Sequence, residues 1–313
     1  MTPPATIEIL MAAYQGGAYI DAQIESVLAQ TCHDWVLRIR DDNSADDTYA
    51  VAQRRAADHP HRIVVNQRPS NSGSASQNFL EMLVGSTGRY VMLADDDDVW
   101  REDKVALTLA EMQRIEASVG AGVPVLVHTD AAVVDQSLRI TSPSMAHVQK
   151  LPVHETRLAR LLVQNSVTGC TVMINRALAD LVREPFDGVA MHDWWLALIA
   201  AAFGRIGYVE APTLLYRQHG GNAVGAVDAR DARYLLGRAL DGNETRARMR
   251  AASAQASAFL AQFGDRLSAR DLSAVATCAG LENRGKLARV TDIARSGLWK
   301  NTALRRIGQI LHV

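Results

Sequence analysis

Residues 89–100 read RYVMLADDDDVW, an apolar run that ends in four consecutive aspartates. A short continuous apolar run is typical of a strand buried on both faces of a parallel sheet. Three comparable runs precede it: TIEILMAAY (6–14), WVLRIRDD (35–42) and RIVVNQR (62–68). Segments with helical spacing separate them: AYIDAQIESVLAQ (18–30), a stretch ending near residue 59, and SASQNFLEMLVG (74–85). This β-α-β-α-β-α-β order predicts an α/β fold with a mostly parallel sheet flanked by helices.

The rest of the chain predicts further strands and then only helices. The expected elements are a helix at about 101–118, a strand pair or hairpin at 123–135, a strand that continues as a helix over 165–182, a buried helix at 191–203 and a strand at 208–219. From residue 229 onward only helical spacing is found. We therefore divide the chain into residues 1–225, which hold the sheet, and residues 226–313, a helical region.

The 313 residues carry a formal net charge of −1, which gives no reason to expect a nucleic-acid partner. The two parts differ, because residues 1–225 hold 18 basic and 26 acidic side chains and residues 226–313 hold 15 and 8. The three cysteines are scattered, which favours a reducing compartment. No signal peptide is evident, and the longest apolar run, 194–203, is far below the roughly 20 residues of a membrane span. We expect a cytoplasmic location.

Acidic side chains are expected to gather at one edge of the sheet. Open α/β sheets bind ligands at the carboxyl ends of their strands, which here carry Asp41, Asp42 and the run from Asp95 to Asp98. The first strand leads into AAYQGGAYI, which weighs against the phosphate loops of dinucleotide dehydrogenases and P-loop NTPases. An acidic edge can hold a diphosphate only through a divalent cation, and Mg²⁺ or Mn²⁺ suits carboxylates. The alternative for four adjacent acids is a solvated turn.

Seven segments in order resemble the family 2 glycosyltransferases, especially the bacterial rhamnosyltransferase-like members that build surface polysaccharides. They are 9–31, RDDNSADDT (40–48), NSGSASQNF (71–79), LADDDDVW (93–100), NSVTGCTVMINRAL (165–178), MHDWW (191–195) and YRQHGGN (216–222). Each motif alone is weak, but the ordered set covers about residues 6–225. The resemblance implies the GT-A fold, a Rossmann-like sheet with flanking helices, and a nucleotide-sugar donor.

The resemblance also implies a donor site. Asp42 matches an acid that hydrogen-bonds the nucleobase, with Asp41 as a neighbour that could share the role, and acceptance from a pyrimidine N3–H favours uracil or thymine. The alternative for Asp42 is an Asx-turn. The other expected donor contacts are Ala12, Tyr14, Asn71, Gly73, Asn78, Asp95, Asp96 and His219. Gly73 could equally serve a turn.

The D-x-D motif of the family matches Asp95 and Asp97. Asp97 resembles the ligand of Mn²⁺ or Mg²⁺, Asp95 faces the ribose or the metal, and His219 resembles a third contact to the metal or the diphosphate. Family members usually have an uncharged residue at the position of Asp96. The extra charge of Asp96 therefore leaves open which of these aspartates binds the metal. A lone histidine such as His219 is also compatible with a structural role.

Asp193 matches the general base of the family, which deprotonates the acceptor hydroxyl in an inverting displacement. The alternative is that Asp193 only caps the helix that follows it. Further residues expected on the sugar and acceptor side are His128, Asp130, Asn165, Gly169, His192 and Trp194. We expect Trp195 to be buried in the core, and Cys170 to be a small buried apolar residue.

The C-terminal helix is expected to be amphipathic, with Leu304, Ile307 and Leu311 on one face and basic residues around it. It suits an anionic lipid surface on the inner face of the membrane, and a packing or homodimer interface is the equal alternative. Together, the residue patterns and the family resemblance predict a metal-dependent inverting transferase. It would move a hexose or deoxyhexose such as L-rhamnose from a dTDP- or UDP-sugar to a saccharide or lipid-linked glycan. The alternatives are a sugar-1-phosphate nucleotidyltransferase and a non-catalytic module that binds sugar nucleotides or glycans.

Overall fold

The computed structural model describes residues 6–220 and 242–313. Its sheet has the order β3-β2-β1-β4-β8-β6-β9-β5, with β7 paired to β6. The first four strands in sequence are β1 (Ile7–Ala13), β2 (Trp35–Asp41), β3 (Ile63–Gln67) and β4 (Tyr90–Asp95). They are all parallel to one another, as the apolar runs predict. The predicted boundary at residue 225 and the first part of the helical stretch after residue 229 lie outside the described residues.

The later strands differ from the prediction in their limits. The expected pair at 123–135 is a single strand, β6 (Val125–Val134), whose antiparallel partner β7 (Ile140–Ser142) comes after it. Only a short strand, β8 (Met173–Asn175), forms within 165–182, wedged antiparallel between β4 and β6. The short helix α7 (Arg176–Ala179) starts at once, because the Asn175 side chain caps it. The final strand β9 (Arg205–Arg217) starts earlier than expected and pairs parallel to β6 and antiparallel to β5 (Val99–Trp100).

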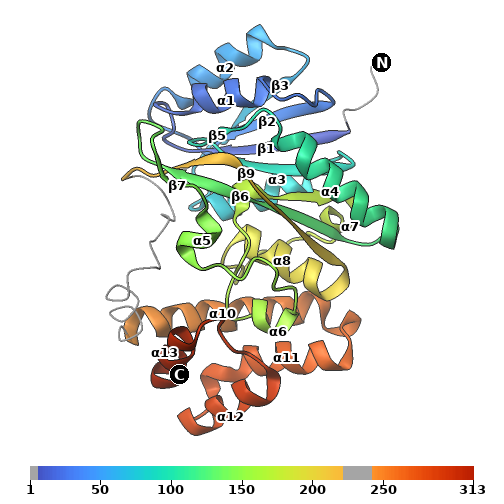
Figure 1. The fold of residues 1–313 in the computed structure, drawn as a ribbon, viewed down its shortest axis with the longest axis vertical. Helices are drawn as coiled ribbons and strands as arrows, with labels where there is room; N and C mark the ends of the chain where they lie inside the picture. The colour runs from blue at the N-terminus through green and yellow to red at the C-terminus, as the bar shows by residue number, and fades with distance from the viewer. Residues whose placement is uncertain (1–5, 221–241) are drawn as a thin grey trace.

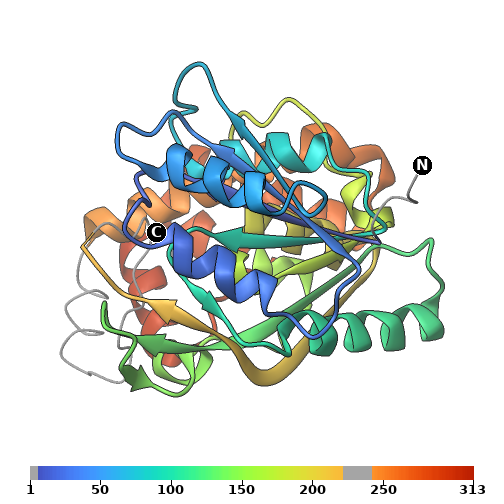
Figure 2. The same cartoon turned by 90° about the horizontal axis from the view of Figure 1, so that it is seen from above.

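Helices cover both faces of the sheet, as Figures 1 and 2 show, and a hydrophobic cluster lies on each face. Ile7, Ile9 and Met11 of β1 pack on one face, against a layer that includes α1 (Ile20–Leu28), α2 (Thr48–Asp58) and α4 (Lys104–Val119). Leu10 and Ala12 alternate to the other face, toward α3 (Ala75–Val84) and α8 (His192–Phe203). The helices at 18–30, 74–85, 101–118 and 191–203 are therefore confirmed to within a few residues.

The C-terminal helices pack beneath α8 and share its core (Figure 1). They are α10 (Gly242–Phe263), α11 (Ala269–Gly280), α12 (Lys286–Ser296) and α13 (Ala303–His312). The fully buried Trp195 ring of α8 lies edge-on to Phe259 of α10 at 5.3 Å, so the prediction that Trp195 is buried is confirmed. Two short helices pack on different elements: α5 (Met145–Gln149) packs on β6, and α6 (Leu158–Leu161) packs on α8 and α11. Among the described helices, none combines the length and apolar character that crossing a membrane requires.

Candidate active site

A cavity of about 970 Å³ lies between the carboxyl edge of the sheet and the C-terminal helices. Most of the predicted site residues line it, although they come from β1, β4, α3, α8 and the loops between them. These are Ala12, Tyr14, Asp42, Asn71, Gly73, Asn78, Asp95, Asp96, Asp97, Asn165, Gly169, His192, Asp193, Trp194 and His219. Residues from all seven sequence segments, with donor and acceptor candidates among them, therefore share one space.

Asp97 and His219 meet at the acidic end of β4. The Nε2 atom of His219 lies 2.8 Å from Oδ2 of Asp97, and the His219 ring stacks on Tyr19 at 4.5 Å between centroids. Arg217, at the end of β9, donates from Nε to the Asp97 carbonyl at 2.8 Å and lies over the Tyr19 ring. This framework holds His219 beside the acids although 122 residues separate it from Asp97 in the sequence.

The backbone N–H groups of the loop after β1 donate hydrogen bonds to side chains and are therefore not available to a phosphate group. The Tyr14 N–H donates to Oδ2 of Asp96 at 2.9 Å, and the N–H groups of the next three residues donate to Ser44, Thr48 and Asp46. A Cβ atom at Gly16 would lie 2.2 Å from the Asp96 carboxylate, so a side chain at position 16 would force that carboxylate to move. Asp96, the unexpected acid, therefore connects this loop to the end of β4.

The carboxylates of the acidic run differ in surroundings. Burial, with Asp97 and Asp193 nearby, raises the pKa of Asp95 to about 7. Asp98 is fully buried and does not line the cavity; its Oδ1 accepts the Arg217 N–H at 3.1 Å. Burial also raises the pKa of Asp98 well above its ordinary value. The run is thus not a solvated turn, because three of its acids line a cavity and the fourth is enclosed.

Two sets of side chains at this point could hold a cation. Asp95, Asp97 and His219 all line the cavity and offer two carboxylates and an imidazole, a donor set whose chemistry suits Mn²⁺ or Mg²⁺, although their ligand atoms do not all lie within 4.8 Å of one another in the described structure. Asp95, Asp98 and Cys170 have ligand atoms within 4.8 Å of one another, but neither Asp98 nor Cys170 lines the cavity. Burial raises the pKa of the Cys170 thiol well above its usual range, so it stays protonated. Only the first set could share a cation with a ligand in the cavity.

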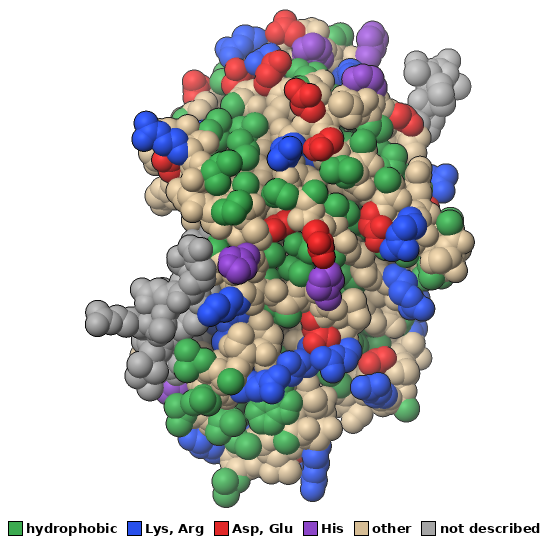
Figure 3. All heavy atoms as spheres, viewed as in Figure 1, with side chains coloured by type: hydrophobic (Ala, Val, Ile, Leu, Met, Phe, Trp, Pro, Cys, Tyr) green, Lys and Arg blue, Asp and Glu red, His purple; other side chains and the backbone are tan. Residues whose placement is uncertain are grey.

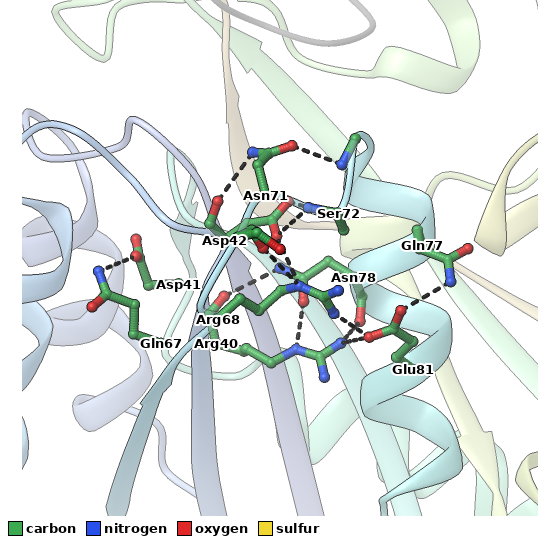
Figure 4. Close-up of polar contacts among 12 residues, drawn as sticks. Arg40, Asp41, Asp42, Gln67, Arg68, Asn71, Ser72, Gln77, Asn78 and Glu81 are labelled. Carbon is green, nitrogen blue, oxygen red and sulfur yellow. Dashed lines mark hydrogen bonds and ion pairs between the residues drawn. The ribbon is translucent and has the colours of Figure 1, made fainter.

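The Asp42 carboxylate is held by the segment that follows β3 (Figure 4). Its Oδ1 accepts the Ser72 N–H at 2.8 Å, its Oδ2 accepts the Ser72 hydroxyl at 2.6 Å, and Arg68 forms an ion pair with it. Asn71 donates from Nδ2 to the Asp42 carbonyl and accepts the Gly73 N–H. An ionised carboxylate has about four acceptor positions, so these contacts orient Asp42 and leave capacity for a ligand N–H.

Asn78 is fixed in the same network. Its Oδ1 accepts from Nε of Arg40 at 2.5 Å, and its Nδ2 donates to the Arg40 carbonyl at 3.2 Å. Glu81 pairs with both Arg40 and Arg68, so two guanidinium groups join α3 to strands β2 and β3 (Figure 4). Asn78 is therefore part of the wall that positions Asp42.

Three predicted residues, Asp41, His128 and Asp130, do not line the cavity. Asp41 is fully buried and accepts from the Ser44 N–H and the Gln67 amide, each at 3.0 Å. Asp130 binds the N–H of Ala146 at 3.0 Å and so holds the start of α5. His128 is buried beside Tyr208, and burial lowers its pKa to about 4. Adjacent strand residues point to opposite faces, so at the end of β2 Asp42 lines the cavity while Asp41 does not.

Asp193 lies at the cavity in the first turn of α8. The N-cap of this helix is Met191, so the alternative that Asp193 is the N-cap residue is wrong. Its Oδ1 does accept the Trp194 N–H at 2.6 Å, and it accepts from Nδ2 of Asn165 at 3.1 Å. Burial raises the pKa of Asp193 to about 6, although these hydrogen bonds favour the ionised form. A carboxylate with this pKa can act as a base near neutral pH.

The neighbours of Asp193 are packed closely. The His192 ring lies 4.4 Å from the Phe79 ring, and a Cβ atom at Gly169 would lie 2.6 Å from Nε2 of His192. Gly169 therefore allows the 3₁₀ turn at 169–171 to approach α8. Trp194 donates from its indole N–H to the Leu161 carbonyl, which fixes the ring at the cavity. Cys170 is buried, as predicted.

Residues 8–181 match the profile of the protein family described as Glycosyl transferase family 2. The chain belongs to this family. A dTDP-rhamnosyl transferase, RfbG of Shigella flexneri, is 24% identical over 235 residues, which make up 72% of this chain and 76% of that protein. The UDP-Glc:alpha-D-GlcNAc-diphosphoundecaprenol beta-1,3-glucosyltransferase WfgD of Escherichia coli is 25% identical over 195 residues, or 62% of this chain and 69% of that one.

Solved glycosyltransferase structures share the fold. TarS 1-349 of S. aureus, in complex with UDP-GlcNAc, superposes with a TM-score of 0.55 at 13% identity over 97% of this chain and 90% of that chain. The mannosyltransferase PcManGT of Pyrobaculum calidifontis, in complex with GDP-Man and Mn2+, gives 0.50 at 17% identity over 99% and 88%. The GT-A fold is confirmed, and this family 2 member is a nucleotide-sugar glycosyltransferase.

The structure adds lining residues that the motifs did not predict in this glycosyltransferase. Tyr19 lines the cavity beside His219, and the helical spacing of its segment gave no sign of this. The C-terminal helices contribute Thr245, Arg248, Ala251, Lys300, Leu304, Arg305, Gly308 and Gln309. No motif marks these residues, and the charge difference between the two parts of the chain was the only signal of them.

Proposed function

We propose that the protein is an inverting, metal-dependent glycosyltransferase that moves a hexose or deoxyhexose from a dTDP- or UDP-sugar to a saccharide acceptor in bacterial surface-polysaccharide assembly. One observation carries the proposal: the Asp193 carboxylate and the set Asp95, Asp97 and His219 line the same cavity. An inverting displacement needs a base on the acceptor side and a stabilised leaving group on the donor side. The names of the two bacterial relatives support the pathway and the donor class.

The residues of the chain divide the reaction between them. Asp42, oriented by Ser72 and Arg68, accepts the N3–H of a uracil or thymine base. Asp193 removes the proton of the acceptor hydroxyl as that oxygen attacks the anomeric carbon from the side opposite the diphosphate. Asn165 holds the Asp193 carboxylate in place. Trp194, fixed by Leu161, offers an aromatic face to a sugar ring.

Asp95, Asp97 and His219 would hold Mn²⁺ or Mg²⁺. When bound, the cation neutralises the charge that develops on the departing diphosphate, so no acid residue is needed there. The raised pKa of Asp95 reflects burial and like charges close together, and a cation would relieve both.

The competing functions are less compatible with the site. A sugar-1-phosphate nucleotidyltransferase binds triphosphate in the loop after the first strand, whereas the N–H groups of Tyr14, Gln15, Gly16 and Gly17 are all bonded to side chains here. A binding module has no use for a buried carboxylate of raised pKa beside the sugar subsite. We therefore favour transfer over both alternatives.

The test is release of nucleoside diphosphate from a panel of dTDP-, UDP- and GDP-sugars, with Mn²⁺, with Mg²⁺ and with EDTA. We expect metal-dependent release with one dTDP- or UDP-sugar. Asp97→Asn should weaken metal-dependent donor binding about 100-fold, whereas Asp58→Asn, which changes an exposed carboxylate on α2, should bind as the wild type does. Donor binding without transfer or hydrolysis across the panel would favour a binding module. Formation of a nucleotide sugar from a sugar phosphate and a nucleoside triphosphate would favour the nucleotidyltransferase.

We further propose that α13 rests on an anionic membrane surface, where a lipid-linked acceptor would be presented. Ile307 and Leu311 are 52% and 47% exposed on its outer face, beside the exposed Arg306. Leu304, expected on this face, is partly buried at the cavity instead. In Figure 3 hydrophobic side chains lie next to a run of Lys and Arg in the lower half of the molecule. Apolar side chains ringed by cations suit anionic lipid.

Vesicle sedimentation tests this surface. The wild type should bind vesicles with anionic phosphatidylglycerol and not vesicles of phosphatidylcholine alone, and the pair Ile307→Ser and Leu311→Ser should abolish binding. Ile140→Ser, at a 62% exposed position on β7, is the control. A concentration-dependent dimer that the α13 pair disrupts, with no vesicle binding, would instead assign the face to a homodimer.

A further inference from the structure

His192 differs from the other residues of the cavity lining in its hydrogen bonding. Its side chain lines the cavity but is 4% exposed, and neither ring nitrogen, Nδ1 or Nε2, has a hydrogen-bond partner among the described residues. Among the described residues of the cavity lining, no other has a buried side-chain nitrogen or oxygen without a partner. Buried polar groups are nearly always hydrogen-bonded in folded proteins, because an unpaired one destabilises the fold. An imidazole at this position therefore has hydrogen-bonding capacity that the described residues do not use.

The His192 ring lies between the donor-side helix α3 and the proposed base. On the side of α3 it contacts the Phe79 ring at 4.4 Å, next to Asn78, which helps to position Asp42. Against Nε2 lies Gly169, where a Cβ atom would be 2.6 Å away. The Gly169 N–H is also one of the hydrogen bonds that favour the ionised Asp193. Nε2 of His192 and the Asp193 carboxylate therefore lie in the same corner of the cavity.

The imidazole of His192 is neutral near physiological pH, because burial lowers its pKa to about 3. A neutral imidazole offers one N–H donor and one acceptor nitrogen. It is a poor base, and it adds no positive charge beside Asp193, where such a charge would lower the pKa of the carboxyl group and weaken it as a base. A hydroxyl group both donates and accepts a hydrogen bond, so it matches what this ring offers.

We propose that His192 forms a hydrogen bond with a hydroxyl group of the transferred sugar and so selects that sugar. This inference rests on the proposed function, because it takes a nucleotide sugar as the ligand. In an inverting displacement the sugar lies between the acceptor oxygen at the base and the diphosphate, which is the space that His192 shares with Asp193. An apolar ring would pack as well against Phe79, so packing alone does not account for an imidazole here. A site that pairs its polar groups with a ligand hydroxyl discriminates against ligands without it.

Two substitutions of opposite character test the proposal. His192→Phe keeps a ring against Phe79 and removes both nitrogens, whereas His192→Gln keeps a donor and an acceptor and removes the ring. Calorimetric titration in Mn²⁺ compares UDP-glucose with UDP and dTDP-L-rhamnose with dTDP, so that the ratio of the two dissociation constants reports the sugar. His192→Phe should lose about three- to tenfold of sugar affinity in at least one pair, the size of a neutral hydrogen bond, with nucleoside diphosphate binding unchanged.

Thermal unfolding gives a second readout in which the two variants should differ in the opposite direction. His192→Phe should unfold at no lower temperature than the wild type, because an apolar ring replaces unpaired polar atoms. His192→Gln should unfold at a lower temperature, because the ring packing is lost, and should retain more of the sugar affinity than His192→Phe does. His128→Phe is the matched control, since His128 is buried with an unpartnered Nε2 but does not line the cavity. Its ratio of dissociation constants should equal that of the wild type.

A role of His192 in packing alone gives the reverse pattern and overturns the proposal. In that case His192→Phe binds every ligand as the wild type does, and His192→Gln loses nucleotide-sugar and nucleoside diphosphate binding equally. An equal loss of sugar affinity in His128→Phe would also overturn it. Absence of transfer across the nucleotide-sugar panel would refute the proposed function and leave the sugar-binding result standing. Transfer by the wild type, with an unchanged ratio of dissociation constants in His192→Phe, would refute the role of His192 and leave the function standing.

Discussion

The acidic and the basic residues that line the cavity are held in place by different means. The acidic wall is formed by Asp42, Asp95, Asp96, Asp97 and Asp193, and the basic wall by Arg248, Lys300 and Arg305. On the acidic wall, side chains are fixed by hydrogen bonds to nearby backbone and side-chain groups, as for Asp42 with Ser72 and Asp96 with Tyr14. The basic lining residues come from helices that are held by packing, because Phe259 of α10 is buried against Trp195 of α8. The difference teaches that the C-terminal helices are part of the enzyme core and not an appendage.

The largest effect is expected at Asp193, the proposed base of the transfer step. Asp193→Asn keeps an oxygen that can accept the Trp194 N–H and removes the base, so the cavity should keep its shape. We expect the rate of transfer to fall between about 10² and 10⁴-fold, the range of a general base, with donor affinity unchanged. Single-turnover rates and calorimetric titration with the nucleoside diphosphate and Mn²⁺ measure the two quantities. Transfer at the wild-type rate would remove Asp193 from the mechanism.

Phe259→Ala tests whether the two regions form one cooperative unit. Its ring is fully buried, and truncation of such a phenylalanine costs about 3–5 kcal/mol of unfolding free energy. We expect a single unfolding transition, shifted to lower denaturant concentration in both circular dichroism and tryptophan fluorescence. Leu272→Ala, at a partly exposed position on α11, should shift it by much less. Two separate transitions, with only one of them moved, would mean that the helices fold independently.

The sequence predicted the sheet well, because β1 and β4 are nearly continuous apolar runs that are buried along their length, and β2 alternates buried with half-buried residues. It predicted the acidic wall well for a related reason, since Asp42, Asp95 and Asp97 follow directly from strand ends. It failed at β8, which is only three residues long and is stabilised by its neighbours β4 and β6 rather than by its own pattern. Asp41, His128 and Asp130 do not line the cavity, because tertiary contacts set the direction in which each side chain points.

The basic wall could not be predicted from residue patterns. Arg248 and Arg305 look like many other arginines of residues 226–313, and only the packing of α10 on α13 brings these two to the cavity. What composition did provide was the charge difference between the two parts of the chain. The charge difference alone could not show whether residues 226–313 face a lipid surface, a second copy of the chain or the acidic residues of 1–225.

The pH dependence of the reaction sharpens the role of Asp193. A base must be deprotonated to act, and the pKa of Asp193 is raised by burial to about 6. The value of kcat/KM should therefore be constant above about pH 7 and fall about tenfold per pH unit below about pH 6. Asn165→Ala removes a hydrogen bond that favours the carboxylate, so its acid limb should move to higher pH. Identical limbs in the two proteins would mean that another group titrates.

Among the acidic lining residues, we expect substitution of Asp96 to have the smallest effect on metal-dependent donor binding. This small effect would distinguish Asp96 from the proposed cation ligands. Asp96→Asn keeps an oxygen that can accept the Tyr14 N–H and removes one charge, so the connection between the β1 loop and β4 should survive. Metal-dependent donor binding should then change by less than about threefold, against about 100-fold for Asp97→Asn. Calorimetric titration with UDP and Mn²⁺ measures both. A loss in Asp96→Asn equal to that in Asp97→Asn would make Asp96 a cation ligand, and the acidic wall would then use its extra charge for chemistry rather than for structure.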